Sequence, residues 1–183
     1  MQVLKDEIRD KILKAALSEF YEKGYNEAAM RCIAERASIP TGLIYSYYKN
    51  KEALFRAVVS PVLYDWEHVL SADNGSSDLI YGVSKAESDC LINLFEHREQ
   101  SIILFDKSEG TKYEHEREHL IENIEKHLNE HKQDQEADEI YIHIIANNFV
   151  DGLMQLMYHY QGKEWAIMQL HKLSKMYNAR IGW

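Results

Sequence analysis

Hydrophobic residues recur along most of this chain three or four residues apart, which is the period of an α-helix rather than that of a strand. Residues 6–23 carry such an apolar stripe, and Gly24 follows it as a natural C-terminal stop. Further periodic segments occupy residues 30–37, 40–47, 51–66, 78–97, 99–107, 112–132, 139–161 and 163–179. The pattern therefore predicts an all-α fold with about nine helices.

The segment 29–51 has the pattern of two short helices joined by a tight turn. Apolar residues fall at i, i+3, i+4 and i+7 from Met30, which gives the first helix one apolar face. Pro40 ends this helix, because the residue before a proline avoids the α region and proline itself fits the first turn of a new helix. A second helix is expected over 40–47, and Asn50 is a good N-cap for the helix after it. Such a pair is typical of the DNA-binding helix-turn-helix, whose second helix enters the major groove.

The spacing of residues 24–55 resembles the N-terminal domain of TetR-type (tetracycline-repressor-like) transcription regulators. The resemblance covers about the first third of the chain and includes Gly24, Tyr25, Ile33, Ala34, Ala37, Ile39, Gly42, Ile44, Tyr45, Tyr47, Tyr48, Lys51, Glu52, Leu54 and Phe55. Three positions depart from the family, which usually has Thr, Gly and Phe where this chain has Ala29, Ser38 and Tyr48. In the family the threonine caps its helix and touches a DNA phosphate.

The resemblance implies which residues contact DNA. Thr41 and Leu43 lie where the family reads base edges, and Gly42 lets the backbone come close to DNA. Tyr45 and Lys51 match the family's phosphate contacts, with Lys51 at a helix N-terminus that itself favours anions. A leucine cannot hydrogen-bond a base, so Leu43 could only contact a thymine methyl or pack locally, and the tyrosines could also simply pack. The candidate DNA contacts are Arg31, Thr41, Gly42, Leu43, Tyr45, Tyr47 and Lys51.

We expect two domains, a DNA-binding helix-turn-helix domain over 1–50 and a helical effector-binding and dimerisation domain over 51–183. The second domain begins with a helix that, by resemblance, links the ligand domain to the DNA-binding domain, which we call the head. Pro61 falls inside this helix, where a proline removes one helical hydrogen bond and kinks or breaks the helix. The kink could be a joint between the domains or a plain bend.

The helix expected over 139–161 is apolar around more than half of its circumference, so we expect it to be buried. The polar arc that remains on it either faces water or lines a cavity, and a buried aspartate there must be hydrogen-bonded. Asp151 could pair with a cationic ligand or make a structural hydrogen bond. The candidates for an effector pocket are Trp66, Phe95, Phe105, Asn148, Asp151, Gln155 and Tyr158.

The last predicted helix, 163–179, has its own apolar arc. This arc could pack within the chain. By resemblance, this helix and the previous one pair with their mates in a second subunit as a four-helix bundle, which suits two heads that bind half-sites about one turn apart. The candidate dimer contacts are Phe149, Leu153, Trp165, Leu170, Leu173 and Tyr177.

The net charge is informative about DNA binding only when residues 1–56 and residues 57–183 are counted separately. The net charge is −9, but residues 1–56 hold ten basic and eight acidic residues and so sum to +2. The acidic excess lies in residues 57–183. The head is only weakly basic, so the DNA prediction depends on the motif rather than on charge.

Composition excludes several other classes of protein. A hydrophobic content of 45% is enough for a packed core, and no uncharged apolar run approaches the ~18–20 residues that a membrane span needs. The N-terminus lacks an apolar signal core, so we expect a cytoplasmic protein without membrane contact. Cys32 and Cys90 form no zinc spacing or disulfide framework, and we expect them to be partly buried.

The leading hypothesis is a homodimeric regulator, a repressor that leaves a palindromic DNA operator when an unknown small-molecule effector binds. No cofactor is expected, and the chain shows no nucleophile–base set or phosphate loop of an enzyme. One alternative is a metal-binding protein or enzyme that uses the histidine-rich helix 112–132. Its histidines His115 and His119 are four residues apart, but no third ligand is evident. Another alternative is a DNA-bound partner of another protein, with no small ligand.

Overall fold

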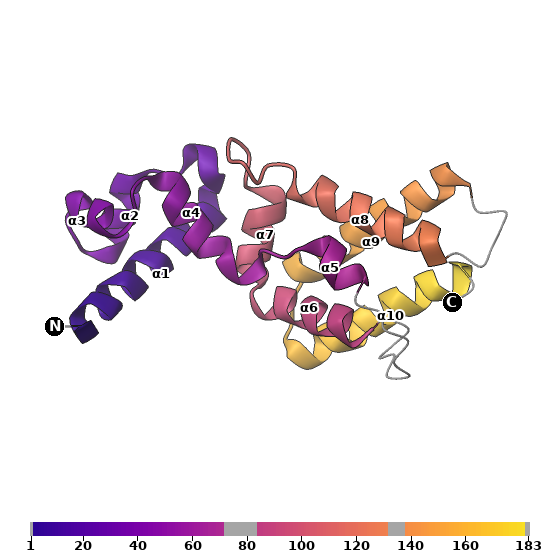
Figure 1. Cartoon of the computed structure of the whole chain (residues 1–183). Coiled ribbons are helices and arrows are strands. Elements are labelled where there is room, and N and C mark those ends of the chain that lie inside the picture. The colour runs from indigo at the N-terminus through magenta and orange to yellow at the C-terminus, as the bar shows by residue number, and fades with distance from the viewer. Residues whose placement is uncertain (1, 72–83, 132–137, 182–183) are drawn as a thin grey trace. The chain divides into compact units, whose positions relative to one another are not determined.

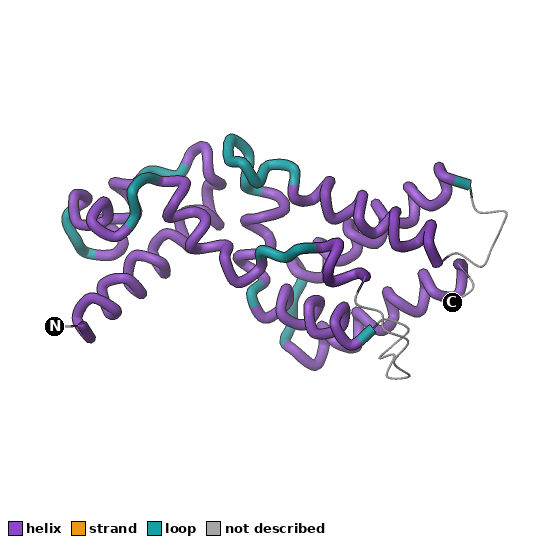
Figure 2. Tube along the Cα trace, viewed as in Figure 1, coloured by secondary structure: helices purple, strands orange, loops and turns teal. Residues whose placement is uncertain are grey.

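The computed structural model describes residues 2–71, 84–131 and 138–181 (Figure 1). Within these ranges it contains ten α-helices, one 3-10 helix and no strand (Figure 2), so the predicted all-α class is confirmed. The chain forms two compact units. Unit 1 consists of Met1–Leu63 and Glu99–His115, and unit 2 of Tyr64–Arg98 and Glu116–Trp183. The predicted domain boundary at residue 50 stays a prediction, because a compact packing unit need not be an independently folding domain.

Unit 1 contains α1 (Gln2–Glu27), α2 (Met30–Ala37), α3 (Thr41–Tyr47), α4 (Lys51–Val59), the 3-10 helix η1 (Ser60–Val62) and most of α7 (Arg98–Asp106). The large apolar side chains that are completely buried in its core include Ile12, Phe20, Ile33, Ile44, Leu54, Phe55, Ile103 and Leu104. Phe55 lies at the centre of an aromatic group, with the rings of Phe20 and Tyr25 edge-on to it at 5.3 and 5.2 Å. Burial of these rings holds α1 to α4.

The helix-turn-helix forms where the sequence predicts it. Asn50 caps α4 as expected, since its side chain accepts a hydrogen bond from the Ala53 amide at 2.8 Å. Ser38 ends α2 in the left-handed conformation, with a φ of 56°, at the position where the family usually has glycine. Gly24 interrupts α1 with a φ of 73°, which agrees with the predicted stop, although a further turn continues to Glu27.

Pro61 breaks the linking helix, as predicted. The α-helix ends at Val59, Pro61 lies within η1, and the chain is non-helical from Leu63 to Asp65 before α5 (Trp66–Ser71) begins. The predicted continuous helix over 51–66 is therefore two helices with a 3-10 turn between them. Its function as a joint stays a prediction.

Unit 2 contains α5, α6 (Lys85–Glu96), α8 (Glu116–His131), α9 (Glu139–Tyr158) and α10 (Lys163–Ile181), and α9 contacts both α8 and α10. The predicted apolar character of α9 is confirmed by its buried residues, which are Ile142, Ile145, Ala146, Val150, Leu153, Met154 and Met157. Gly152 allows close packing on α10, since a Cβ at this position would lie 2.9 Å from Leu173 Cδ1.

Two helices begin later than the sequence pattern predicts. α6 begins after Ser84, whose hydroxyl accepts from the Glu87 amide at 3.2 Å while the Glu87 carboxylate accepts from the Ser84 amide at 2.6 Å. The first part of the predicted segment 78–97, up to residue 83, lies outside the described residues. α8 begins at residue 116 rather than 112, because the Thr111 hydroxyl bonds the Ser108 carbonyl and the Tyr113 amide and holds a turn there.

Candidate nucleic-acid interface and ligand-domain residues

The α3 helix turns one face into unit 1 and the other to solvent. Ile44 and Tyr48 are buried, as expected for positions four residues apart on one face. Gly42 and Tyr45 are exposed, and 51% of Tyr45 is accessible. The other candidates on this helix, which are Thr41, Leu43 and Tyr47, are half-buried. Within unit 1, α3 therefore has an outward face of the kind that a recognition helix needs.

Gly42 is a glycine that the fold does not require. A Cβ at position 42 would meet no atom within 4 Å, and the residue does not have a positive φ. A glycine in a helix costs about 0.5–1 kcal/mol relative to alanine. This cost is explained if the α3 backbone approaches another molecule closely.

Arg31 lies in the first turn of α2 and is strongly exposed. Its Nε donates to Glu35 Oε1 at 2.9 Å, one turn along the same helix. Exposed pairs of this kind contribute little to stability, so the guanidinium can leave Glu35 for another acceptor.

The ammonium group of Lys51, a predicted phosphate contact, bonds to backbone carbonyl oxygens of unit 1. Nζ donates to the carbonyl oxygens of Tyr25 at 2.6 Å, Ala28 at 2.9 Å and Asn26 at 3.3 Å. Burial lowers the pKa of Lys51. Sequence reasoning missed these acceptors because a backbone carbonyl has no signature in the sequence.

A buried carboxylate bonds to the start of α2, which has no side-chain cap. Ala29 has no side chain that could cap this helix, but its amide donates to Glu19 Oε1 at 3.4 Å. The fully buried Glu19 also pairs with Lys23 at 3.0 Å and, through Oε2, with Arg36 Nε at 3.0 Å. Sequence reasoning missed Glu19, although a charged residue seven positions after Ile12 on the apolar face of α1 is a signal that could have found it.

The seven candidate effector-pocket residues are divided between the two units and differ in burial. Trp66 and Phe95 are buried within unit 2, whereas Phe105 is buried within unit 1. The polar arc of α9 is exposed and consists of Asn148, Asp151, Gln155 and Tyr158. The Asp151 side chain is 61% exposed and pairs with Arg117 Nη2 at 2.5 Å, which agrees with the alternative that this arc faces water. The pattern could not distinguish a solvent-facing arc from a cavity wall.

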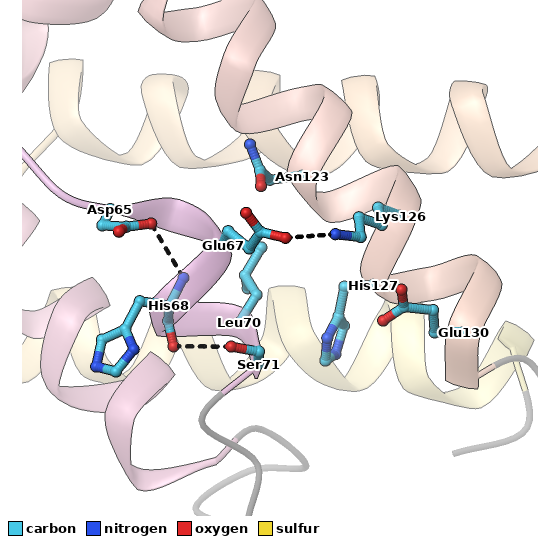
Figure 3. Close-up of a pocket in the computed structure, with 9 residues that line it drawn as sticks. All are labelled: Asp65, Glu67, His68, Leu70, Ser71, Asn123, Lys126, His127 and Glu130. Carbon is cyan, nitrogen blue, oxygen red and sulfur yellow. Dashed lines mark hydrogen bonds and ion pairs between the residues drawn. The ribbon is translucent and has the colours of Figure 1, made fainter.

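A hollow of about 460 Å³ lies on α5 and α8 of unit 2 (Figure 3). Its lining residues are mostly polar and comprise Asp65, Glu67, His68, Leu70, Ser71, Asn123, Lys126, His127 and Glu130. The Lys126 ammonium pairs with Glu67 Oε1 at 2.6 Å between the two helices. None of the seven predicted pocket residues lines this hollow, and its polar walls differ from the expected aromatic lining.

The residues predicted as dimer contacts on α9 and α10 differ in how much of each is exposed. Leu153 and Leu170 are buried inside their own protomer, so they have little area to offer to a partner. The other predicted contacts, Phe149, Trp165 and Leu173, are half-buried, and the side chain of Tyr177 lies outside the described residues. The large apolar side chains that these two helices expose are Ile140, Ile144, Tyr158, Met168 and Met176.

His115, just before α8, and His119, in its first turn, each lie near a carboxylate. His115 lies 3.6 Å from Glu114, and His119 lies 3.9 Å from Glu116. Within the described parts of the chain, no three His, Cys, Asp or Glu residues are gathered in a way that could hold a metal ion. In the same parts, no helix combines the length and the hydropathy that a bilayer span requires.

The N-terminal part of the chain is similar in sequence to known proteins. Residues 12–58 match the family model described as "Bacterial regulatory proteins, tetR family". The HTH-type transcriptional regulator UidR of Escherichia coli (strain K12) is 35% identical over 71 residues, which are 39% of this chain and 35% of UidR. The chain thus spans about a third of the length of the curated relatives it matches first.

Two solved structures are similar to nearly the whole chain. A TetR-like transcriptional regulator from Rhodococcus sp. RHA1 matches with a TM-score of 0.59 and 20% identity, over 96% of this chain and 97% of that one. NalD, the secondary repressor of the MexAB-OprM multidrug efflux pump in Pseudomonas aeruginosa, matches with a TM-score of 0.56 and 18% identity, over 92% and 94%. At this identity the two structures establish the fold, while the family match concerns the N-terminal part.

Proposed function

We propose that this chain, a TetR-family protein by its N-terminal domain and its fold, is a homodimeric regulator of transcription in the cytoplasm. It binds a palindromic DNA operator as a repressor and leaves it when a small-molecule effector binds. The observation that carries the proposal is α3, which lies inside the matched segment and turns Gly42 and Tyr45 outward.

The geometry of α3 supports contact with the major groove. An α-helix with its side chains is about 10–12 Å in diameter, so α3 matches a groove about 12 Å wide. Tyr45 presents a hydroxyl on this face for a phosphate oxygen, and Gly42 lets the backbone approach without a Cβ. Arg31, at the start of α2, provides a guanidinium for a guanine edge or a phosphate.

The exposed apolar face of α9 and α10 supports a homodimer. Ile144 on α9 and Met168 on α10 are each about half exposed, at 49% and 48%, and Ile140 is 68% exposed. Apolar side chains of this size on adjacent helices are stabilised when a second copy covers them. The same two helices of a partner would complete a four-helix bundle around a twofold axis.

The effector is proposed to bind unit 2, where the hollow on α5 and α8 offers carboxylates, an ammonium group and imidazoles to a polar molecule. The chain passes between the two units at three places, after Leu63, after Arg98 and after His115. A ligand that favours one arrangement of unit 2 can therefore act on the head through three covalent connections. A coupling of about 1–3 kcal/mol is sufficient to change operator occupancy.

Selection of bound sequences from random DNA with the purified full chain tests the proposal. We expect enrichment of a pseudo-palindrome whose half-sites lie about one helical turn apart. The double variant Thr41→Ala/Tyr45→Ala should lose this enrichment while it keeps the thermal midpoint of the wild type, because neither side chain is buried. His119→Ala, an exposed change on α8, is the control and should enrich the same sequence. Absence of any enrichment with the wild-type chain would refute the proposal.

A further inference from the structure

Lys51 is the first residue of α4, and its ammonium group is turned toward the end of α1. The three carbonyl oxygens that accept from Nζ belong to Tyr25, Asn26 and Ala28, at distances of 2.6 to 3.3 Å. Nζ also lies 4.3 Å from the centre of the Tyr25 ring, within the range of a cation–π interaction. An ammonium group has three N–H donors, so these carbonyls use its full donor capacity.

These acceptors lie where α1 ends and the chain turns into α2. Carbonyl groups in the last turn of a helix have no partner within that helix, and the negative end of the helix dipole attracts a cation. Lys51 therefore caps α1 from a position 23 or more residues further along the chain. The corner between α1 and α2, residues 25–29, is held to the start of α4 by these charge-assisted bonds.

We propose that Lys51 is an intramolecular clamp that positions α2 and α3 for DNA, rather than a ligand of a DNA phosphate. The positioning role rests on the proposed function, whereas the clamp itself stands on the geometry of unit 1 alone. A phosphate contact by the same ammonium group would have to replace bonds to three carbonyls. The lowered pKa of Lys51, which burial causes, agrees with an ammonium group that has exchanged water for protein oxygens.

The salt dependence of DNA binding separates a clamp from a phosphate contact. Each phosphate contact that is lost reduces the slope of log K against log salt by about 0.9, whereas a positioning residue contributes nothing to this slope. The test compares Lys51→Met with Lys49→Met, in which an exposed lysine two residues earlier is removed. For each full-length variant, the thermal midpoint and the amide exchange of residues 25–33 are measured without DNA. The affinity for the selected operator is then measured across a series of salt concentrations.

We expect Lys51→Met to lower the thermal midpoint and speed up amide exchange at residues 25–33, with Lys49→Met leaving both unchanged. Operator affinity of Lys51→Met should fall about ten-fold at every salt concentration, with the slope of the wild type, because the loss of charge-assisted hydrogen bonds has about this effect. If Lys51→Met does not fold, Lys51→Arg replaces it. Arginine keeps the charge for a phosphate, but its planar fork does not match a site built for a compact ammonium group.

Two results would overturn the clamp. One is an unchanged midpoint and unchanged exchange in Lys51→Met, or in Lys51→Arg if the methionine variant does not fold. The other is a slope of log K against log salt that is smaller in Lys51→Met than in the wild type, by about 0.9 for each DNA-binding head. If the wild-type chain binds no DNA, the proposed function fails, and the midpoint and exchange measurements still decide whether the clamp exists.

Discussion

The Glu19 carboxylate and the Arg36 guanidinium meet inside the head, with Oε2 and Nε 3.0 Å apart and the Glu19 side chain fully buried. Arg36 lies in the last turn of α2, and Glu19 also accepts a hydrogen bond from the Ala29 amide at the start of this helix. One carboxylate on α1 therefore bonds to both ends of α2. A buried charge persists only when its partners compensate for the lost hydration, so these contacts are coupled.

Replacement of Glu19 by glutamine should lower the free energy of unfolding by about 1–3 kcal/mol, because Arg36 and Lys23 lose their shared buried counter-charge. Urea denaturation of the full chain measures this loss. Glu22→Gln is the matched control, since Glu22 pairs with the same Arg36 but is exposed, and its change should be much smaller. Equal losses in the two variants would show that burial of Glu19 has no special effect.

Gly42→Ala should change stability and DNA binding in opposite directions. The variant should gain about 0.5–1 kcal/mol in free energy of unfolding, because the added methyl group meets nothing within 4 Å and alanine favours the helix. Operator affinity, measured by fluorescence anisotropy, should fall if α3 lies against DNA. Gly152→Ala is the control, because its Cβ would lie 2.9 Å from Leu173 Cδ1, so it should destabilise the protein. Undiminished operator affinity in Gly42→Ala would contradict a close approach.

Ile144→Glu should convert the proposed homodimer to a monomer at micromolar concentration. The side chain is 49% exposed on α9, so a carboxylate there does not disturb the core of the protomer but would be buried without a partner in a dimer. Sedimentation velocity measures the change in mass. His119→Glu places the same charge on an exposed position of α8 and should leave the dimer intact. A wild-type chain that sediments as a monomer would remove the basis of this prediction.

The two cysteines should differ strongly in reactivity. Burial raises the pKa of the Cys90 thiol to about 12, whereas Cys32 is half-buried. At pH 8 a maleimide should label Cys32 in the native protein, and Cys90 only after urea unfolds it, because the thiolate is the reactive form. Mass spectrometry of the labelled peptides measures both. Rapid native labelling of Cys90 would be inconsistent with its burial.

The raised pKa of Cys90 also has a consequence for stability. The unfolded chain releases this proton near pH 9, whereas the folded chain holds it to about pH 12. Its contribution is therefore fully present below pH 9 and is lost as the pH rises from 9 toward 12. Tyr64, whose pKa is also raised by burial, acts in the same direction at higher pH. Cys90→Ala should reduce the fall in the urea midpoint between pH 9 and 10.

Features with local causes could be predicted from the sequence. The turn before Pro40, the Asn50 cap and the break at Pro61 each depend on residues within a few positions, and the structure contains all three. The inward orientation of Ile44 and Tyr48 follows from helical period alone. These signals were sufficient for the fold class and for the outward face of α3.

Features that depend on distant partners could not be predicted in this way. The acceptors of Lys51 are backbone carbonyls more than twenty residues away. Periodicity places Leu153 and Asp151 on an apolar face and a polar arc of α9, but it does not say what covers either one. The structure buries Leu153 within the protomer and pairs Asp151 with Arg117 at the surface. Only packing decides these environments, and packing is not local in sequence.

Unit 1 is discontinuous, since Met1–Leu63 is completed by Glu99–His115. The Tyr25 amide donates to the Lys107 carbonyl at 2.9 Å, and the Tyr113 ring stacks on Phe55 at 6.2 Å. During translation at about 5–20 residues per second, residues 64–115 follow residue 63 over about 3–10 s. For that interval the nascent head has Phe55 without its Tyr113 neighbour, so holdase chaperones have a period in which they can bind it.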